Sequence, residues 1–128
     1  MDDIKSVKDK DKNGDDSAKV YSILPLRNTV LFPQQIIPIY IGREESLQLI
    51  SDLPNTGKKY IAVVAQKDGS VEHPKSSDLY NYGTLAVVLK VFDMPDKSKS
   101  AIVQGLERIK VDKFMSPKPY FKGIVTTI

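Results

Sequence analysis

Residues that could do chemistry are few in this sequence. The only histidine, His73, lies in a polar loop between Glu72 and Pro74. One imidazole beside one carboxylate supplies neither the ligand set of a zinc site nor the base and nucleophile of a triad. No serine stands in a nucleophile-elbow motif. We therefore assign no catalytic, cofactor-binding or metal-binding residue, and we expect no enzyme activity from this chain itself.

An acidic motif near the start resembles half of a calcium loop. Asp9, Asp11, Asn13 and Gly14 stand where the first, third, fifth and sixth residues of such a loop would be. The twelfth position, where a bidentate glutamate is needed, is Val20. We therefore interpret the motif as part of a solvated, charged tail.

Another segment resembles the end of a phosphate-binding loop. Residues 54–59 are Pro-Asn-Thr-Gly-Lys-Lys, but Asp52 stands where the first glycine belongs. Lys59 replaces the serine or threonine whose hydroxyl would bind magnesium. The segment is better explained as a turn that ends a helix.

A pair of aspartates, Asp93 and Asp96, brackets a second predicted turn. Aspartate is favoured in turns because its side chain accepts hydrogen bonds from nearby backbone N–H groups. We therefore interpret the pair as turn chemistry and not as a catalytic acid and base.

Basic charge is modest and uneven. The formal net charge is +3, and residues 1–19 hold six Asp and five Lys. A nucleic-acid-binding domain usually concentrates more basic charge on one face. A late group of lysines is interleaved with Asp96, Glu107 and Asp112, which favours a solvated face. These lysines are Lys97, Lys99, Lys110, Lys113, Lys118 and Lys122.

Length and composition indicate one domain with a charged leader. A chain of 128 residues has room for one core. No apolar run approaches the roughly 18–20 residues of a membrane span, and the start lacks the apolar region of a signal peptide. Cysteine is absent, which excludes disulfides and thiolate metal sites. We expect a cytoplasmic protein with no membrane contact.

The elements that would position any site are mostly strands. Residues 1–19 lack apolar periodicity and predict a disordered leader. One amphipathic helix is predicted over about 43–53, with Leu47, Ile50 and Leu53 on its buried face. Strands are predicted over residues 20–26, 35–41, 60–66, 83–92, 100–111 and 120–127. In the strand 83–92, Leu85, Val87, Leu89 and Val91 are expected to face one way. In the strand 100–111, Val103, Ile109 and Val111 share a face and Leu106 does not, so Gly105 is the expected place for a bulge.

Three prolines interrupt the apolar stretch 23–46. Pro25, Pro33 and Pro38 each lack a backbone donor, so they predict short, kinked strands near sheet edges. Residues 20–26 are therefore predicted to form an edge or first strand. Phe32 and Tyr40 are interpreted as core residues, because aromatic side chains in such runs are usually buried, and contact with a partner is the alternative for both.

An ordered set of motifs closely resembles the amino-terminal domain of the ATP-dependent Lon protease family. The likeness covers about residues 21–126. The matching residues are Leu24-Pro25-Leu26-Arg27-Asn28, Leu31-Phe32-Pro33, Ile37-Pro38-Ile39-Tyr40-Ile41-Gly42-Arg43-Glu44-Glu45-Ser46, Val64-Ala65-Gln66-Lys67, Asp78-Leu79-Tyr80, Tyr82-Gly83-Thr84 and Val103-Gln104-Gly105-Leu106-Glu107-Arg108.

The resemblance implies a mostly β, PUA-like pseudo-barrel of about six short strands over residues 20–128. It also implies a non-catalytic domain that gathers unfolded or tagged protein substrates and supports a homo-hexamer. In the family, a helical segment, an ATPase that uses ATP and magnesium, and a Ser-Lys peptidase follow this domain. Those parts have no counterpart here, so we expect a chain cut at a domain boundary and carry over no catalytic residue.

Two alternatives stay open. A nucleic-acid-binding PUA-like module is one, because PUA-like folds include RNA binders and Lon proteins bind DNA, at least weakly. A stand-alone Lon-domain protein without a protease is the other. The sequence does not identify the surface that would bind a substrate.

Overall fold

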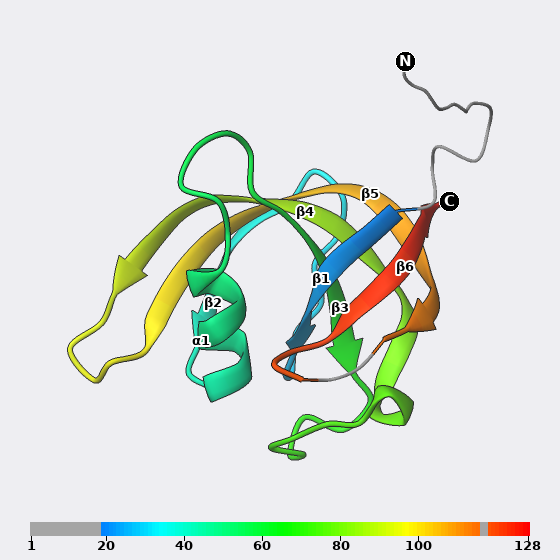
Figure 1. The fold of residues 1–128 in the computed structure, drawn as a ribbon, viewed down its shortest axis with the longest axis horizontal. Coiled ribbons are helices and arrows are strands. Elements are labelled where there is room, and N and C mark those ends of the chain that lie inside the picture. The colour runs from blue at the N-terminus through cyan, green and yellow to red at the C-terminus, as the bar shows by residue number, and fades with distance from the viewer. Residues whose placement is uncertain (1–18, 116–117) are drawn as a thin grey trace.

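The structure is a computed structural model that describes residues 19–115 and 118–128. Figure 1 shows how the elements of these residues are arranged. The elements are β1 (Lys19–Leu26), β2 (Ile36–Ile41), α1 (Glu44–Ser51), β3 (Tyr60–Gln66), the short 3₁₀ helix η2 (Ser76–Asp78), β4 (Leu79–Asp93), β5 (Lys99–Phe114) and β6 (Lys122–Thr127). The predicted mostly β fold with one prominent helix is confirmed. The calcium-like motif lies outside the described residues, as does the predicted leader apart from Lys19.

The strands form one sheet that closes on itself. Their order is β2-β5-β4-β3-β1-β6, and β6 also pairs with β5. Five strands therefore make a ring, and β2 is added at one edge. The closure depends on the length of β5, which pairs with β2 along residues 99–104 and with β6 along residues 109–114. In Figure 1, β4 and β5 arch together across the molecule. The predicted pseudo-barrel is confirmed.

The ring buries apolar side chains on both of its faces. Neighbours such as Ile23 and Leu24 point to opposite faces, as side chains in a strand must, yet both are fully buried. Residues of the five ring strands and Phe121 form an inner core: Ile23, Ala62, Val64, Leu79, Leu85, Ile109, Val111, Phe121 and Val125. On the outer face, β2 and α1 cover a second core that includes Leu24, Ile39, Ile41, Leu49, Ile50, Ile61, Val63 and Val103.

A bulge on β5 lies next to Gly105, as predicted. Leu85 pairs with Glu107 and Ala86 pairs with Gly105, so Leu106 is the extra residue. The glycine is required because the loop before β2 crosses it closely. A Cβ atom at position 105 would lie 2.3 Å from the carbonyl oxygen of Phe32. Backbone hydrogen bonds of 2.8 and 2.9 Å between Gly105 and residues 34 and 35 hold the loop there.

A second bulge makes one prediction wrong. The sequence places Leu89 on the same inward face as Leu85, but Leu89 is 51% exposed. Val88 pairs with Val103 and Lys90 with Ile102, so Leu89 is the unpaired residue. The shift of one residue turns this leucine outward.

Two of the three prolines lie inside strands. Pro38 is in β2, which pairs only with β5, so the predicted edge position is confirmed. Of the two alternatives predicted for residues 20–26, β1 is the first strand and not an edge strand, because it lies between β3 and β6. Its two halves pair on different sides: residues 19–22 with β6, and residues 23–26, including Pro25, with β3. Pro33 lies in the loop before β2.

The helix presents a slightly different face from the predicted one. α1 covers residues 44–51, and its buried residues are Ser46, Leu49 and Ile50. Leu47 and Leu53 are only partly buried against the outer core. Leu49, which is 1% exposed, was not among the predicted stripe. One turn of helix separates Ser46 from Leu49 and Ile50, so this face packs on the sheet.

Candidate functional site

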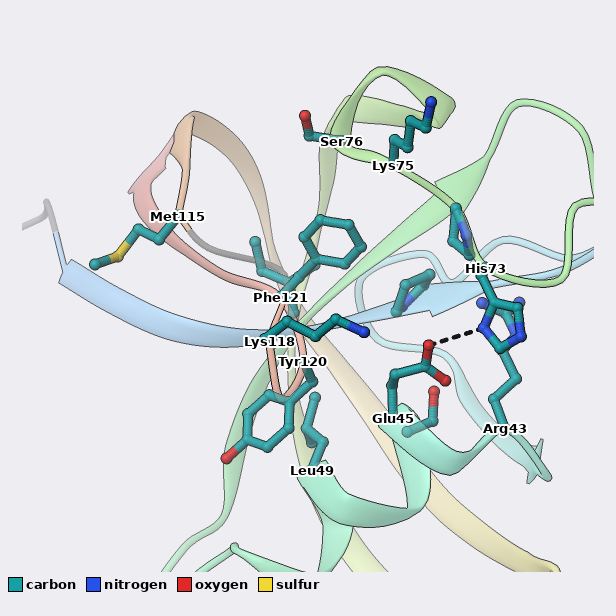
Figure 2. Close-up of a pocket in the computed structure, with 14 residues that line it drawn as sticks. Arg43, Glu45, Leu49, His73, Lys75, Ser76, Met115, Lys118, Tyr120 and Phe121 are labelled. Carbon is teal, nitrogen blue, oxygen red and sulfur yellow. Dashed lines mark hydrogen bonds and ion pairs between the residues drawn. The ribbon is translucent and has the colours of Figure 1, made fainter.

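A cavity of about 340 Å³ lies beside α1 and is called the helix cavity below. Four parts of the chain that are far apart in the sequence line it: β1, α1, the loop of residues 67–78, and the residues Met115, Lys118, Tyr120 and Phe121. Figure 2 shows their side chains converging on one space. The closure of the ring brings these segments together, because β6 returns to lie beside β1.

The floor of the helix cavity is apolar. Ile23, Leu49 and Phe121 line it and belong to the two cores. Phe121 also packs edge-on against Phe114, with ring centroids 6.0 Å apart. Tyr120 completes the floor, and its hydroxyl donates a 2.8 Å hydrogen bond to Asp52 at the end of α1. Burial, and then this bond to Asp52, raise the pKa of the Tyr120 hydroxyl.

The rim of the helix cavity is charged. Glu45, in the first turn of α1, and His73, in the loop of residues 67–78, are joined at 2.9 Å between Oε2 and Nδ1. Burial alone would raise the pKa of the Glu45 carboxyl. The bond from His73, the backbone amide of Glu45 and the positive charges of His73 and Lys118 outweigh burial and lower this pKa. In Figure 2 the amine of Lys118 extends toward this carboxylate.

Arg43 ties the helix to the base of the loop. It occupies the N-cap position of α1, and its guanidinium donates a hydrogen bond to the side-chain oxygen of Gln66. The amide of Gln66 in turn donates to the carbonyl oxygens of Asp68 and Val71, both at 3.0 Å. Burial is the main reason that the pKa of Arg43 is lowered, followed by the charge of Arg27. This network fixes one wall of the cavity.

A second, more polar hollow of about 470 Å³ lies on the other side of Arg43, between β1, β2 and Glu72. Tyr40 lines it and is 68% exposed, while Phe32 is 55% exposed. Their interpretation as core residues is therefore wrong. Ile36, Pro38 and Tyr40 are exposed and alternate along β2 with Ile37, Ile39 and Ile41, which are buried or partly buried.

The acidic turn residues have local partners. Asp96 accepts hydrogen bonds from the backbone N–H of Ser98, at 3.1 Å, and from its hydroxyl. Asp93 pairs with Lys99 at 2.5 Å. Both belong to the β4–β5 hairpin, so the interpretation as turn chemistry is confirmed. The phosphate-loop-like segment follows α1 as a turn, with Gly57 at a φ of 76°.

The late lysines do not form one patch. Lys97 and Lys99 lie at the tip of the β4–β5 hairpin, whereas Lys110 and Lys113 lie near the far end of β5. At about 3.3 Å per strand residue, Lys99 and Lys110 are separated by about 36 Å along β5. Lys118 lies at the helix cavity, and Lys122 Nζ is 5.7 Å from the Tyr120 ring centroid.

Sequence reasoning missed the pairing of His73. It considered the adjacent Glu72, but Glu72 lies 3.8 Å from Arg27, and His73 meets Glu45, 28 residues away. No periodicity could reveal this contact, because it depends on how the loop folds back over α1. Within residues 19–115 and 118–128, no three His, Asp or Glu side chains are grouped to hold a metal ion. No helix in that part of the chain is long and apolar enough to cross a membrane.

Comparison with known proteins identifies relatives of this chain. Residues 20–128 match the family described as the ATP-dependent protease La (LON) substrate-binding domain. A Lon protease of Koribacter versatilis is 44% identical over 116 residues, which is 89% of this chain. A Lon protease of Dictyoglomus thermophilum is 42% identical over 113 residues, or 88% of this chain. The chain spans 14% of the length of each of these relatives.

Two solved structures share the fold. The Lon N-terminal domain protein from Xanthomonas campestris has a TM-score of 0.65 at 19% identity, over 85% of this chain and 59% of that one. The N-terminal domain of the Mycobacterium avium complex Lon protease has a TM-score of 0.65 at 17% identity, over 86% of this chain and 55% of that one. At such identities the likeness shows the fold alone. The family match over residues 20–128 carries the assignment: this chain belongs to the Lon substrate-binding domain family.

Proposed function

We propose that this chain is the substrate-recognition and assembly domain of an ATP-dependent Lon-type serine protease. The observation that carries the proposal is the match of residues 20–128 to the Lon substrate-binding domain. The parent protein would use ATP and magnesium and a Ser-Lys peptidase to degrade misfolded and regulatory proteins in the cytoplasm. This domain would hold the substrate and would do no chemistry itself.

An exposed apolar surface supports the capture of unfolded chains. Ile36 and Tyr40 are 56% and 68% exposed on the outer face of β2, and Phe32 precedes them in the loop. β2 is an edge strand, so its outer side offers backbone groups to an extended segment. Exposed apolar groups at an unpaired edge are a typical contact surface for polypeptide.

Binding by one domain should be weak. A small exposed surface without a deep interface suits a Kd in roughly the micromolar to millimolar range. In a homo-hexamer, several linked copies would raise the effective concentration and strengthen the capture of one chain. We expect the isolated domain to self-associate weakly, if at all, because the family resemblance implies that the strong assembly contacts lie in the ATPase and peptidase parts of the parent protein.

The test is an NMR titration of the labelled chain with a reduced, alkylated protein and with the same protein folded. Chemical-shift changes in β2 and the loop before it that occur with the unfolded protein, and not with the folded one, would support the proposal. Tyr40→Ser should weaken this binding, whereas Tyr60→Ser, at an exposed tyrosine outside β2, should leave it unchanged. Absence of any shift with the unfolded form would refute the proposal.

A second candidate function, nucleic-acid binding, is favoured by one observation. Tyr80 and Tyr82 are about half exposed on one face of β4. Lys67 Nζ lies 6.0 Å from the Tyr80 ring centroid, and Lys110 is the cross-strand partner of Tyr82. Exposed aromatic rings beside cations are surfaces on which single-stranded bases stack.

Oligonucleotide titration separates this second candidate from the first. Single-stranded DNA should cause shifts around Tyr82 that weaken steeply with salt, and Tyr82→Ser should abolish them, if the nucleic-acid function holds. The reading frame after residue 128 tests the remaining alternative. A phosphate-binding loop and a Ser-Lys peptidase there would support the protease, whereas a stop codon would support a stand-alone Lon-domain protein.

A further inference from the structure

We propose that the helix cavity binds one large apolar side chain of a captured polypeptide, with an acidic residue beside it at the rim. This inference rests on the proposed capture of protein substrates. It assigns that capture a specific pocket, separate from the exposed face of β2, and a preference for neighbouring charge.

The size and floor of the helix cavity suit a large side chain. Its volume is about 340 Å³, and its deepest residues are Ile23, Leu49 and Phe121. A dry cavity of roughly 150 Å³ with a similar lining is enough to hold benzene. The helix cavity therefore has room for a phenylalanine or leucine side chain and for part of the backbone that bears it.

The charges around the opening favour an acidic neighbour. Arg43, Lys75 and Lys118 contribute three positive charges to the lining, and Glu45 contributes the one carboxylate. That carboxylate is engaged by His73 and by the charge of Lys118, so Arg43 and Lys75 make up the positive excess. Asp78 is not in the lining, and its carboxylate accepts the backbone N–H of Lys75 at 2.8 Å. An aspartate or glutamate next to the apolar side chain would meet this positive excess, whereas a lysine would be repelled.

One atom at the rim is suited to a peptide backbone. Oε1 of Glu45 is buried and has no hydrogen-bond partner among the described residues. A buried acceptor without a donor is unfavourable, and an N–H group would satisfy it. An extended polypeptide supplies N–H groups along its length, which a hydrocarbon or a simple fatty acid does not. This observation favours polypeptide over a small apolar acid as the occupant.

The first experiment compares short polar peptides that differ only at their centre. We expect a peptide with Asp-Phe-Asp to bind about tenfold or more tightly than one with Asp-Ser-Asp, because the serine peptide cannot bury an apolar ring in the helix cavity. It should also bind more tightly than one with Lys-Phe-Lys, and that difference should shrink as salt is raised. The amide signals of Leu49 and Phe121 should shift.

Two serines of one loop provide matched variants. Ser76 lines the helix cavity and Ser77 does not, and both are exposed. Ser76→Trp places a large ring at the opening and should weaken the Asp-Phe-Asp peptide about tenfold, whereas Ser77→Trp should change its Kd less than about twofold. If Ser76→Trp does not fold, Lys75→Glu serves instead. It should remove the preference for the acidic peptide, and Lys58→Glu, in the turn after α1, should not.

The outcomes distinguish this inference from the proposed function. If the wild type binds unfolded protein but Ser76→Trp and Ser77→Trp have equal effects, or the shifts avoid the helix cavity, the inference is wrong and the proposed function stands. Binding of small apolar acids in the cavity without binding of any phenylalanine peptide would also overturn it. If the wild type binds no unfolded protein at all, both proposals fail.

Discussion

The closed ring and the helix cavity are held together by different interactions. Inside the ring, Ile23, Ile109 and Val111 have no exposed surface, and the strands that bear them pair along most of their length. At the cavity rim, the loop of residues 67–78 is attached through a few polar contacts. Its His73 side chain is 73% exposed even though it bonds to Glu45.

Because the interactions differ, the ring and the cavity rim should differ in the free energy that is needed to open them. Apolar burial contributes about 1.5–3 kcal/mol for each large side chain, whereas an exposed ion pair contributes about 0–1 kcal/mol. The ring should therefore open only when the whole domain unfolds, while the rim should open locally at a lower cost. A rim that moves on a rigid wall can admit side chains of different shapes.

The largest effect is expected where the ring meets the loop before β2. Gly105→Val would force a side chain against the Phe32 backbone, and the hydrogen bonds between Gly105 and residues 34 and 35 prevent that backbone from moving away. We expect a loss of about 3 kcal/mol or more in the free energy of unfolding. Urea denaturation measures it. Gln104→Val, one residue earlier on β5, should cost much less, and equal losses would mean that the close approach is not limiting.

A smaller loss is expected at the helix, which covers the outer core. Leu49→Ala should cost about 2–5 kcal/mol, because Leu49 is 1% exposed and its removal leaves a cavity. Leu47 is only partly buried, so Leu47→Ala should cost clearly less. Thermal and urea unfolding compare the two variants. The reverse order would show that the helix face predicted from the sequence is the correct one.

At the cavity wall, Gln66→Leu should cost about 1–3 kcal/mol. The substitution deprives Arg43 of its acceptor and the Asp68 and Val71 carbonyl groups of their donor. Hydrogen exchange should accelerate at the amide of Lys67, which bonds to the carbonyl of Asp78 at 2.8 Å and closes the loop. Exchange in β5 should change only as far as global stability does. Gln48→Leu, on the exposed side of α1, is the control.

The strands could be predicted from the sequence because their signals are local and repeated, whereas the closure into a pseudo-barrel was implied by the family resemblance. Alternating apolar residues and turn chemistry place the six strands within a few residues, and the odd parity of Leu106 indicates the bulge at Gly105. Leu89 was misplaced because its bulge has no glycine to mark it. Pro25 suggested an edge position for β1. It lies inside the sheet because residues 23–26 pair with β3 on one side only, so the missing N–H of Pro25 breaks no ladder.

The helix cavity could not be predicted in the same way. Its lining comes from positions 23 to 121. The contacts of Arg43 with Gln66, Glu45 with His73 and Tyr120 with Asp52 join residues 23, 28 and 68 positions apart. The sequence motif of residues 37–46 includes Arg43 and Glu45, but it does not indicate that they line a cavity. Such contacts depend on how the loop of residues 67–78 and Tyr120 pack against the helix. Only the conjunction of an acidic first turn and a lone histidine could have suggested the pair.

The smallest effect is expected at the rim itself. The pKa of Glu45 is lowered from its ordinary value of 4.5, so the folded protein favours the ionised carboxylate more than the unfolded chain does. The resulting stabilisation is present above about pH 4.5 and is lost as the pH falls through the lowered pKa. Glu45→Gln should therefore cost no more than about 1 kcal/mol near pH 6, because the side chain is one-third exposed and solvent screens the pair with His73. The difference from the wild type should disappear in more acidic solution. Glu44→Gln, in the same turn, is the matched control for loss of a carboxylate near the helix N-terminus. Equal losses of stability for the two variants near pH 6 would mean that the pair with His73 contributes nothing.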